Sequence, residues 1–421
     1  MKSEWSERIR HIESTVALLK KAGLAHRVAE DSRLNGREIT LGGERLVNFG
    51  SCSYLGLETD ERLKSAACAA VERYGVVFSS SRAYVSVPLY AEFEGLLSEF
   101  VGRHPVVVAP NTSLAHQAAL PILVRDRDAV CFDVMVHSSV QAALPALIQR
   151  GIHCEPIPHN RIDLLERRAR RLALTHERVH YLCDGVYSMH GDLVKLDELY
   201  DLLDQLHYLH AYVDDAHGVG WAGRHGSGIV LGERGLHERA VVALGLAKSF
   251  ATSGAVLALP SAELARRIFT CGGPLIFSGP LQPAQLGAGI ASALIHLSPE
   301  IGVLQDQLRA RVALFDEQAA ALGVEAVTQN RSPIRFIEVG SDEAAVALAK
   351  RLHGDGYFVN VSTFPAVARG RAGVRLMLTC QQTSEDVIGL VQSLARAGQP
   401  QRRASSKARA GSVAELRRFH E

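Results

Sequence analysis

Two loop segments of the sequence carry side chains suited to acid–base and nucleophilic chemistry. Asp214 and His217 lie three residues apart, directly after the apolar run Ala211–Val213. Lys248 follows the apolar run Val241–Leu244, and its neighbours are apolar or small. Because burial disfavours the charged ammonium, such a lysine has a lowered pKa and becomes a nucleophile toward carbonyl groups. Taken singly, a lysine is more often a surface residue with its stem along apolar side chains, and an Asp–His pair is more often a loop hydrogen bond.

The combination of these residues is more specific than either part. A carboxylate after one central strand and a lysine after the next are what pyridoxal 5′-phosphate chemistry requires. The lysine attaches the cofactor, and the carboxylate keeps its pyridine nitrogen protonated so that the ring withdraws electrons. Asp214 and Lys248 therefore predict a pyridoxal phosphate site.

The elements that must position these residues form an alternating pattern between about residues 45 and 330. Short apolar runs alternate there with longer helical patterns, and nearly continuous hydrophobicity is typical of strands buried on both faces. We therefore predict an α/β domain whose mostly parallel sheet is covered by helices. Ligands of such sheets bind beyond the carboxyl ends of the strands. The runs are Val106–Ala109, Ala129–Phe132, His180–Cys183, Ala211–Val213, Val241–Leu244 and Ala255–Ala258.

The segments on either side of this domain have different patterns. Apolar residues at helical spacing predict an amphipathic helix over about residues 4–28, within an N-terminal arm of residues 1–45. The large domain then covers residues 46–330, a small C-terminal α+β domain covers 331–398, and a basic tail of residues 399–421 is expected to fray in solvent. The elements expected in the small domain are strands at Ile334–Val339, Tyr357–Val361 and Val374–Thr379, a helix over Asp342–His353, and a helix with Ser384 as N-cap.

The composition excludes several classes of protein. With 421 residues, 46 Lys+Arg against 45 Asp+Glu, and 47% hydrophobic residues, the chain is globular rather than disordered. Its net charge of +1 gives no electrostatic case for binding nucleic acid or a membrane surface. The seven scattered cysteines form no CxxC pair, so neither a disulfide framework nor a metal site is expected. No apolar stretch approaches the ~20 residues of a membrane span, and we expect a cytoplasmic protein.

Five ordered motifs resemble those of the α-oxoamine synthases, a family of fold-type-I pyridoxal phosphate enzymes. The family includes 8-amino-7-oxononanoate synthase, serine palmitoyltransferase, 5-aminolevulinate synthase, glycine C-acetyltransferase and the synthase of the α-aminoketone autoinducer. The resemblance covers about residues 45–395 and implies a large domain with a seven-stranded sheet and a small C-terminal domain. The motifs are Asn48–Leu57, Asp184–Asp192, Asp214–Gly218, the Lys248 segment and Arg375–Thr379.

The resemblance implies a catalytic role for several single residues. Lys248 would hold the cofactor and later move the Cα proton of the substrate. Asp214 would pair with the pyridinium nitrogen, and His217 with the ring hydroxyl. His137 matches a histidine that stacks on the ring, with a surface-loop histidine as the simpler alternative. Arg375 matches the arginine that grips the amino-acid carboxylate, a task suited to its planar fork; an ordinary strand arginine is the alternative.

Further positions match residues that line the family's pocket. Asp184 and Ser188 would line the cofactor and substrate pocket. Thr112, Ser113 and Leu114 follow a strand and open a helix, where backbone N–H groups favour a phosphate, although Thr112 and Ser113 could equally be N-caps. Ser278 matches a residue that reaches the phosphate from the partner subunit, so the resemblance implies a homodimer with shared active sites.

The implied reaction is a decarboxylative Claisen-type condensation of an amino acid with an acyl thioester, giving an α-aminoketone, CO₂ and a free thiol. The thioester would be carried by coenzyme A or by an acyl carrier protein. Two alternatives remain: another fold-type-I reaction such as transamination, and a non-catalytic regulatory subunit, against which the joint presence of Lys248, Asp214, His217 and His137 counts.

Departures from the family pattern lie around the substrate and the phosphate. Cys52 and Ser53 stand in the substrate-binding segment where an asparagine is usual. These changes favour a secondary-metabolic or signalling role over biotin synthesis. The other departures are Ser86 for a glycine, Gly245 for a hydroxyl residue, Gly279 for a threonine and Gln382 for a histidine.

Overall fold

The computed structural model describes residues 4–398, and the predicted basic tail lies outside these residues. Its centre is a seven-stranded sheet in the order β3-β9-β8-β7-β6-β4-β5. Neighbouring strands are parallel except β9, which is antiparallel to both β3 and β8. The strands are β3 (Val106–Ala109), β4 (Ala129–Asp133), β5 (His153–Ile157), β6 (Val179–Asp184), β7 (Leu209–Asp214), β8 (Ala240–Gly245) and β9 (Ala255–Ala258).

The predicted α/β domain with a mostly parallel, seven-stranded sheet is confirmed, and all six predicted apolar runs are strands of it. The unpredicted strand is β5, whose sequence mixes His153, Glu155 and Pro156 with apolar residues. It lies at the sheet edge, where a proline and polar residues are tolerated because one side of the strand has no ladder partner.

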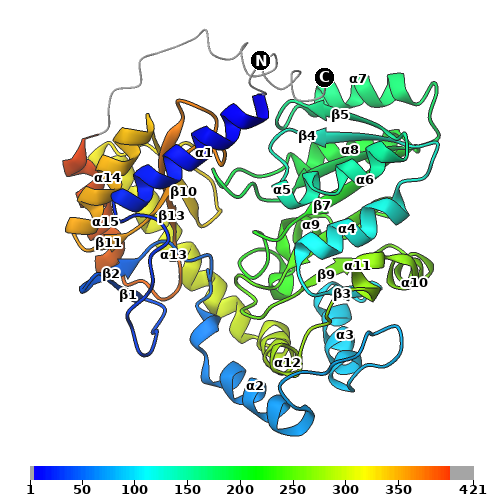
Figure 1. Cartoon of the computed structure of the whole chain (residues 1–421), viewed down its shortest axis with the longest axis horizontal. Coiled ribbons are helices and arrows are strands. Elements are labelled where there is room, and N and C mark those ends of the chain that lie inside the picture. The colour runs from blue at the N-terminus through cyan, green and yellow to red at the C-terminus, as the bar shows by residue number, and fades with distance from the viewer. Residues whose placement is uncertain (1–3, 399–421) are drawn as a thin grey trace.

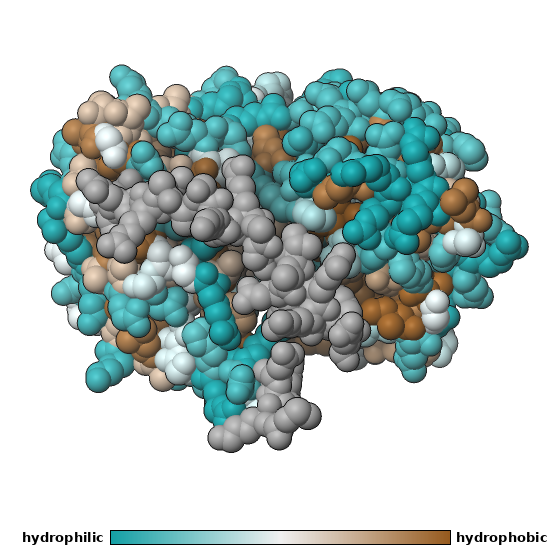
Figure 2. Space-filling view, turned by 90° about the horizontal axis from the view of Figure 1, so that it is seen from above, coloured by the Kyte–Doolittle hydropathy of each residue, from teal (hydrophilic) through white to brown (hydrophobic). Residues whose placement is uncertain are grey.

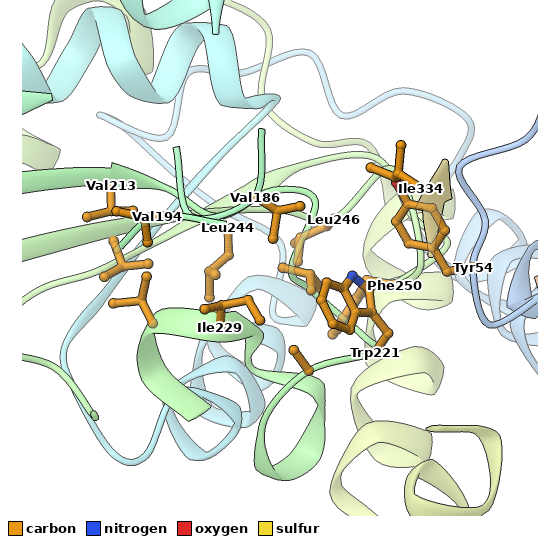
Figure 3. Close-up of a cluster of buried hydrophobic side chains, with 14 of the residues drawn as sticks. Tyr54, Val186, Val194, Val213, Trp221, Ile229, Leu244, Leu246, Phe250 and Ile334 are labelled. Carbon is orange, nitrogen blue, oxygen red and sulfur yellow. The ribbon is translucent and has the colours of Figure 1, made fainter. Parts of the chain in front are cut away.

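Both faces of the large sheet are buried. Alternate residues of β7 and β8 belong to two separate hydrophobic clusters, one with Val213 and Leu244 and the other with Tyr212 and Ala243, as expected when successive side chains point to opposite faces. Figure 3 shows part of the first cluster, where Ile229 lies near Leu244. Helices contributing to the first cluster include α2 (Glu61–Tyr74), α3 (Leu89–Phe100), α7 (Ile162–Leu172), α8 (Leu196–Gln205), α9 (Gly228–Glu233) and α12 (Pro283–Leu297). Those of the second are α4 (Thr112–Leu123), α5 (Ser138–Gln141), α6 (Leu144–Gln149), α10 (Ala262–Cys271) and α11 (Gly273–Ile276).

The C-terminal part is built around a second, antiparallel sheet in the order β10-β13-β12. The predicted single strand over 357–361 is wrong, because it is two strands that join different sheets: β11 pairs with β2 and β12 with β13. The N-terminal hairpin is thereby tied to the C-terminal part, as Figure 1 shows. The elements are β1 (Glu38–Leu41), β2 (Glu44–Asn48), β10 (Ile334–Gly340), β11 (Tyr357–Phe358), β12 (Asn360–Ser362), β13 (Ala372–Met377), α13 (Glu300–Leu322), α14 (Asp342–Gly354) and α15 (Ser384–Ala397).

Two predicted helix boundaries are corrected. Helix α1 (Glu4–Lys21) ends well before residue 28, because Gly23 adopts φ 71°, a left-handed conformation that ends helices. Helix α15 is capped by Thr383, not by Ser384: the Thr383 side chain accepts the Asp386 amide, and the Asp386 side chain accepts the Thr383 amide.

Helix α1 packs on the C-terminal part, with the His11 ring 5.3 Å from that of Phe364. Among residues 4–398, no single helix is long and apolar enough to cross a membrane. Helices α12 and α13 are long and apolar enough only when taken together, and they are bent by 81° relative to each other. The face in Figure 2 is mainly hydrophilic, with separate hydrophobic patches. All seven cysteines are free thiols. No group of three or more His, Cys, Asp or Glu side chains within the described range could hold a metal.

Candidate active site

The carboxyl ends of the central parallel strands meet at one edge of the sheet and carry the predicted polar residues. Asp184 ends β6 and Asp214 ends β7, and the two are register partners. Lys248 lies three residues beyond the end of β8, and His137 opens the short helix α5 after β4. Each of these side chains is near enough to another to change its pKa.

Asp214 is a buried carboxylate that stays ionised. Burial raises its pKa, but His116, Lys248 and His137 lower it to about 2. Its Oδ2 accepts from Nε2 of His116 at 3.0 Å, and its Oδ1 accepts from the Ala216 amide at 3.0 Å. A fixed anion at this point can hold the proton of a pyridinium nitrogen.

Lys248 and Asp184 have pKa values shifted away from their charged forms. Burial lowers the pKa of the Lys248 amine, and the positive charge of Arg375 lowers it further, while Asp214 and Cys52 oppose the shift. Burial and the charge of Asp214 raise the pKa of Asp184 well above its usual value. A neutral amine beside the sheet edge is the form of lysine that acts as nucleophile and base.

His217 is a buried imidazole held by an aromatic residue. Its Nδ1 lies 2.7 Å from the hydroxyl of Tyr54, and its backbone oxygen accepts from the Trp221 indole. Burial, Lys248 and Arg375 lower its pKa well below the usual value, so the ring is neutral. Tyr54 and Trp221 belong to the same hydrophobic cluster (Figure 3), which fixes the loop after β7.

His137 is oriented by two hydrogen bonds. Its backbone amide donates to Oδ1 of Asp184 at 3.0 Å, and its Nδ1 lies 2.7 Å from the Ser139 hydroxyl. Partial desolvation lowers the pKa of the imidazole, with Lys248 adding to the effect and Asp214 opposing it. The ring is therefore neutral, which suits stacking on another ring.

Arg375 and Cys52 are brought together although 323 positions separate them. Arg375 lies in β13, and its Nη2 is 3.7 Å from Sγ of Cys52. Its buried Nε has no acceptor among residues 4–398, so a donor is left over for a substrate carboxylate. Ser53, by contrast, uses its hydroxyl to hydrogen-bond Glu58, whose pKa burial raises.

The start of helix α4 offers unused amides. Asn111 is the N-cap, and its side chain accepts from the Leu114 amide at 2.9 Å, so neither Thr112 nor Ser113 is the cap. The backbone amides of Thr112 and Ser113 have no acceptor within the described part of the chain. They can hold an anion, as free amides at helix starts commonly do, whereas the Leu114 amide is already engaged.

The two remaining predicted residues, Ser188 and Ser278, are both half-buried. Ser188 is half-buried in the turn of the Asp184–Asp192 loop. Ser278 is half-buried after α11, where its hydroxyl donates to the Pro274 carbonyl. Within this single chain, Ser278 therefore has a local partner.

Sequence reasoning missed two histidines. His116 is fully buried in α4, with Nδ1 2.8 Å from the Tyr212 hydroxyl and Nε2 on Asp214. His159 bridges Asp133 and Asp192, which ties the Asp184–Asp192 loop to the end of β4. The one sequence signal for His116 was its position on the apolar face of the helix that follows Asn111.

The residues present fit pyridoxal phosphate. The ionised Asp214 would hold its ring nitrogen, Lys248 its aldehyde carbon, and the free amides of Thr112 and Ser113 its phosphate. Gly245 lets the loop after β7 and the start of α4 pack closely beside them, because a Cβ there would lie 2.8 Å from the Ala216 Cβ and 3.4 Å from the Thr112 Cγ2.

Comparisons with known proteins identify relatives of this chain. The family model of class I and II aminotransferases matches residues 44–394. The 8-amino-7-oxononanoate synthase of Symbiobacterium thermophilum is 31% identical over 383 residues, which are 90% of this chain and 95% of that protein. The synthase of the same name from Thermosipho melanesiensis is 30% identical over 373 residues, or 88% and 92% of the two chains.

A solved structure shares the fold. The serine palmitoyltransferase of Sphingomonas wittichii superposes with a TM-score of 0.85 at 23% identity, covering 94% of this chain and 98% of that one. At this identity the likeness concerns the fold alone.

Proposed function

The chain belongs to the α-oxoamine synthases within the class I and II aminotransferase family and is a pyridoxal phosphate-dependent acyltransferase, and we propose that it condenses an amino acid with an acyl thioester. The products would be an α-aminoketone, CO₂ and a free thiol. The observation that carries the proposal is the pairing of the Lys248–Asp214–His217 cluster with Arg375 and its unsatisfied buried donor.

The chain's own residues divide the work between cofactor and substrate. Bound pyridoxal phosphate supplies a protonated ring that takes up negative charge from the substrate Cα. Asp214 holds the proton on the ring nitrogen, His217 and His137 orient the ring, and Asp184 fixes the His137 backbone.

Lys248 moves the substrate proton. Its neutral amine, favoured by burial and by Arg375, takes the proton from Cα. Cα then attacks the thioester carbonyl, the C–S bond breaks, and the thiolate takes a proton from solvent. After CO₂ leaves, the lysine returns a proton to Cα, so that the amine ends as it began.

Arg375 grips the amino-acid carboxylate. The free Nε and the Nη2 near Cys52 form the planar edge that binds a carboxylate in two places. Cys52 lies at this end of the site, beside the Arg375 guanidinium. Ser53, with its hydroxyl turned to Glu58, would contribute through its backbone, and Ser188 would line the cofactor and substrate pocket.

We also propose that the protein is a homodimer with shared sites. Exposed apolar residues gather around Ser278: Phe277 and Tyr84 are each 88% exposed, with Val76 and Val77 nearby in sequence to Tyr84. The two segments touch, since the Phe78 amide donates to Gln282. Exposed apolar side chains on two segments that touch favour burial against another protein. Light scattering of the wild type and of Phe277→Asp tests this: a dimer that Phe277→Asp dissociates supports it, and a wild-type monomer refutes it.

The function is tested by a substrate screen. Holoenzyme is incubated with single amino acids and with short, medium and long acyl thioesters of coenzyme A or of acyl carrier protein, and products are identified by mass spectrometry. A productive pair should release CO₂ and thiol, and Lys248→Ala should release neither. Keto-acid formation without thiol would favour an aminotransferase. We propose a role in secondary metabolism or signalling, because Cys52 and Ser53 replace the usual substrate-binding residue. We also propose that the enzyme acts in the cytoplasm.

A further inference from the structure

A polar cavity lies near the amino ends of the central strands of the large sheet, whereas the candidate active site lies beyond their carboxyl ends. It has a volume of about 250 Å³ and is lined by residues near the starts of β6, β7 and β8 and by the first turn of α10. Because Lys248 and Asp214 follow the other ends of these parallel strands, the cavity is separate from the candidate active site.

Four arginines line this cavity: Arg125, Arg178, Arg239 and Arg267. Two of them are matched by acidic residues that also line it, since Arg239 pairs with Glu238 and Arg267 with Glu263. The guanidinium groups of Arg125 and Arg178 have no hydrogen bond or ion pair with any residue from 4 to 398. The buried Nε of Arg239 also lacks an acceptor there. The cavity therefore has a surplus of donors and of positive charge.

Two imidazoles also line the cavity. His180 and His210 are register partners on β6 and β7, and their rings stack with centroids 5.2 Å apart. His180 is partnered by Asp128 through Nε2 at 3.0 Å. Burial lowers the pKa of His210 to about 3, and the charges of His180, Arg178 and Arg239 contribute. The imidazole of His210 is therefore neutral and can offer one N–H donor to a ligand.

We propose that this cavity binds a phosphate group, either as the free ion or at the end of a small ester. Arginine forks match phosphate oxygens in pairs, and such charge-assisted hydrogen bonds are among the strongest in proteins. The volume is below the ~300–1,000 Å³ of sites for drug-sized ligands, so the cavity admits a phosphate with a small substituent. Arg125 and Arg178 would supply the charge, and the Arg239 Nε a further donor.

The test measures phosphate binding to the holoenzyme, in which pyridoxal phosphate already fills its own phosphate site. Inorganic phosphate is titrated by calorimetry at constant ionic strength, set with chloride. Arg178→Gln and Arg125→Gln should each weaken binding by about tenfold or more, the effect of one lost charge-assisted bond.

Arg127→Gln is the matched control, because Arg127 lies two residues from Arg125, is 77% exposed and pairs with Glu177 outside the cavity. It removes the same charge and should leave the dissociation constant within about twofold. Equal weakening in all three variants would show a general charge effect and overturn the proposal, as would no binding to the wild type.

A second titration distinguishes the two sources of the phosphate group. Glycerol 3-phosphate binding as tightly as inorganic phosphate, with the same loss in Arg178→Gln, identifies a phosphate ester. Exclusion of glycerol 3-phosphate with retained phosphate binding identifies the free ion. Binding of either probe that is unaffected by both cavity variants contradicts the site.

Discussion

Replacing His116 tests how the cofactor-binding carboxylate is held. An ionised carboxylate only accepts hydrogen bonds, so Nε2 of His116 must donate to Asp214. Nδ1 lies 2.8 Å from the hydroxyl of Tyr212, whose pKa burial raises well above its usual value. The Tyr212–His116–Asp214 chain thus orients the ring and aims the Nε2 proton at the carboxylate. His116 is in this account a positioning residue that acts through Asp214.

The magnitude follows from the bond that would be lost. A hydrogen bond to a charged group contributes about 1.5–3 kcal/mol, which corresponds to about 10- to 100-fold in an equilibrium constant. In His116→Leu the ionised form of Asp214 loses this bond, and the pKa of Asp214 should rise. The carboxylate then holds the pyridinium proton less well, so pyridoxal phosphate should dissociate about 10- to 100-fold more readily.

The assay is a titration of apoprotein with pyridoxal phosphate, followed by absorbance, together with the pH dependence of the visible band. His116→Gln keeps a donor and should recover most of the affinity, whereas Tyr212→Phe spares the bond to Asp214 and should have a smaller effect than His116→Leu. Thermal unfolding of each apoprotein checks that the variants fold. A folded His116→Leu with wild-type affinity and an unchanged pH midpoint would refute the reasoning.

Further substitutions address the carboxylate end of the site and the loop after β6. Arg375→Lys removes the planar fork and should raise KM for the amino acid about 10- to 100-fold, with kcat less affected; an unchanged KM would place the carboxylate elsewhere. Cys52→Asp puts a carboxylate beside Arg375 and should raise the same KM about tenfold or more, whereas Cys52→Ala should keep it within about threefold. His159 has its pKa raised to about 10: burial opposes this shift, and Asp133 and Asp192 cause it. Its charge therefore stabilises the fold fully below about pH 6.5 and less as the pH rises through 10. The thermal unfolding midpoint of the wild type should fall more between pH 7 and 10 than that of His159→Leu. Equal falls in the two proteins would contradict a charged His159 in the folded state.

The position of the site followed from the sequence because of the sheet geometry. Buried parallel strands read as continuous apolar runs, and the residues that follow them meet at one edge. Asp214 and Lys248 are therefore neighbours in space although a helix, α9, and a strand, β8, lie between them. The antiparallel direction of β9 was not predictable, because an apolar run has no direction.

The corrected boundaries depended on choices that the sequence leaves open. Thr383 and Ser384 are both good N-caps, and only the reciprocal bonds with Asp386 select Thr383. Thr112 and Ser113 are likewise good caps, yet Asn111 takes that role and leaves their amides free. In each case a shift of the N-cap by one residue changes which backbone amides of the first helical turn stay free.

The contacts of His116 could not be read from the sequence. Its two partners, Tyr212 and Asp214, are 96 and 98 residues away, and a histidine on an apolar helix face gives no signal of which strand it meets. The same holds for Cys52 and Arg375, because Cys52 lies in the loop after β2 and Arg375 in β13. Long-range pairs of polar side chains are set by packing, and no local pattern encodes them.

The central claim is tested most directly by product stoichiometry. For a substrate pair found by the screen, CO₂ from a carboxyl-labelled amino acid, free thiol and aminoketone are measured in the same reaction. We expect the condensation to give equal amounts of all three, with none formed by Lys248→Ala. Keto acid from the amino acid without thiol release, or thiol release without CO₂, would contradict it.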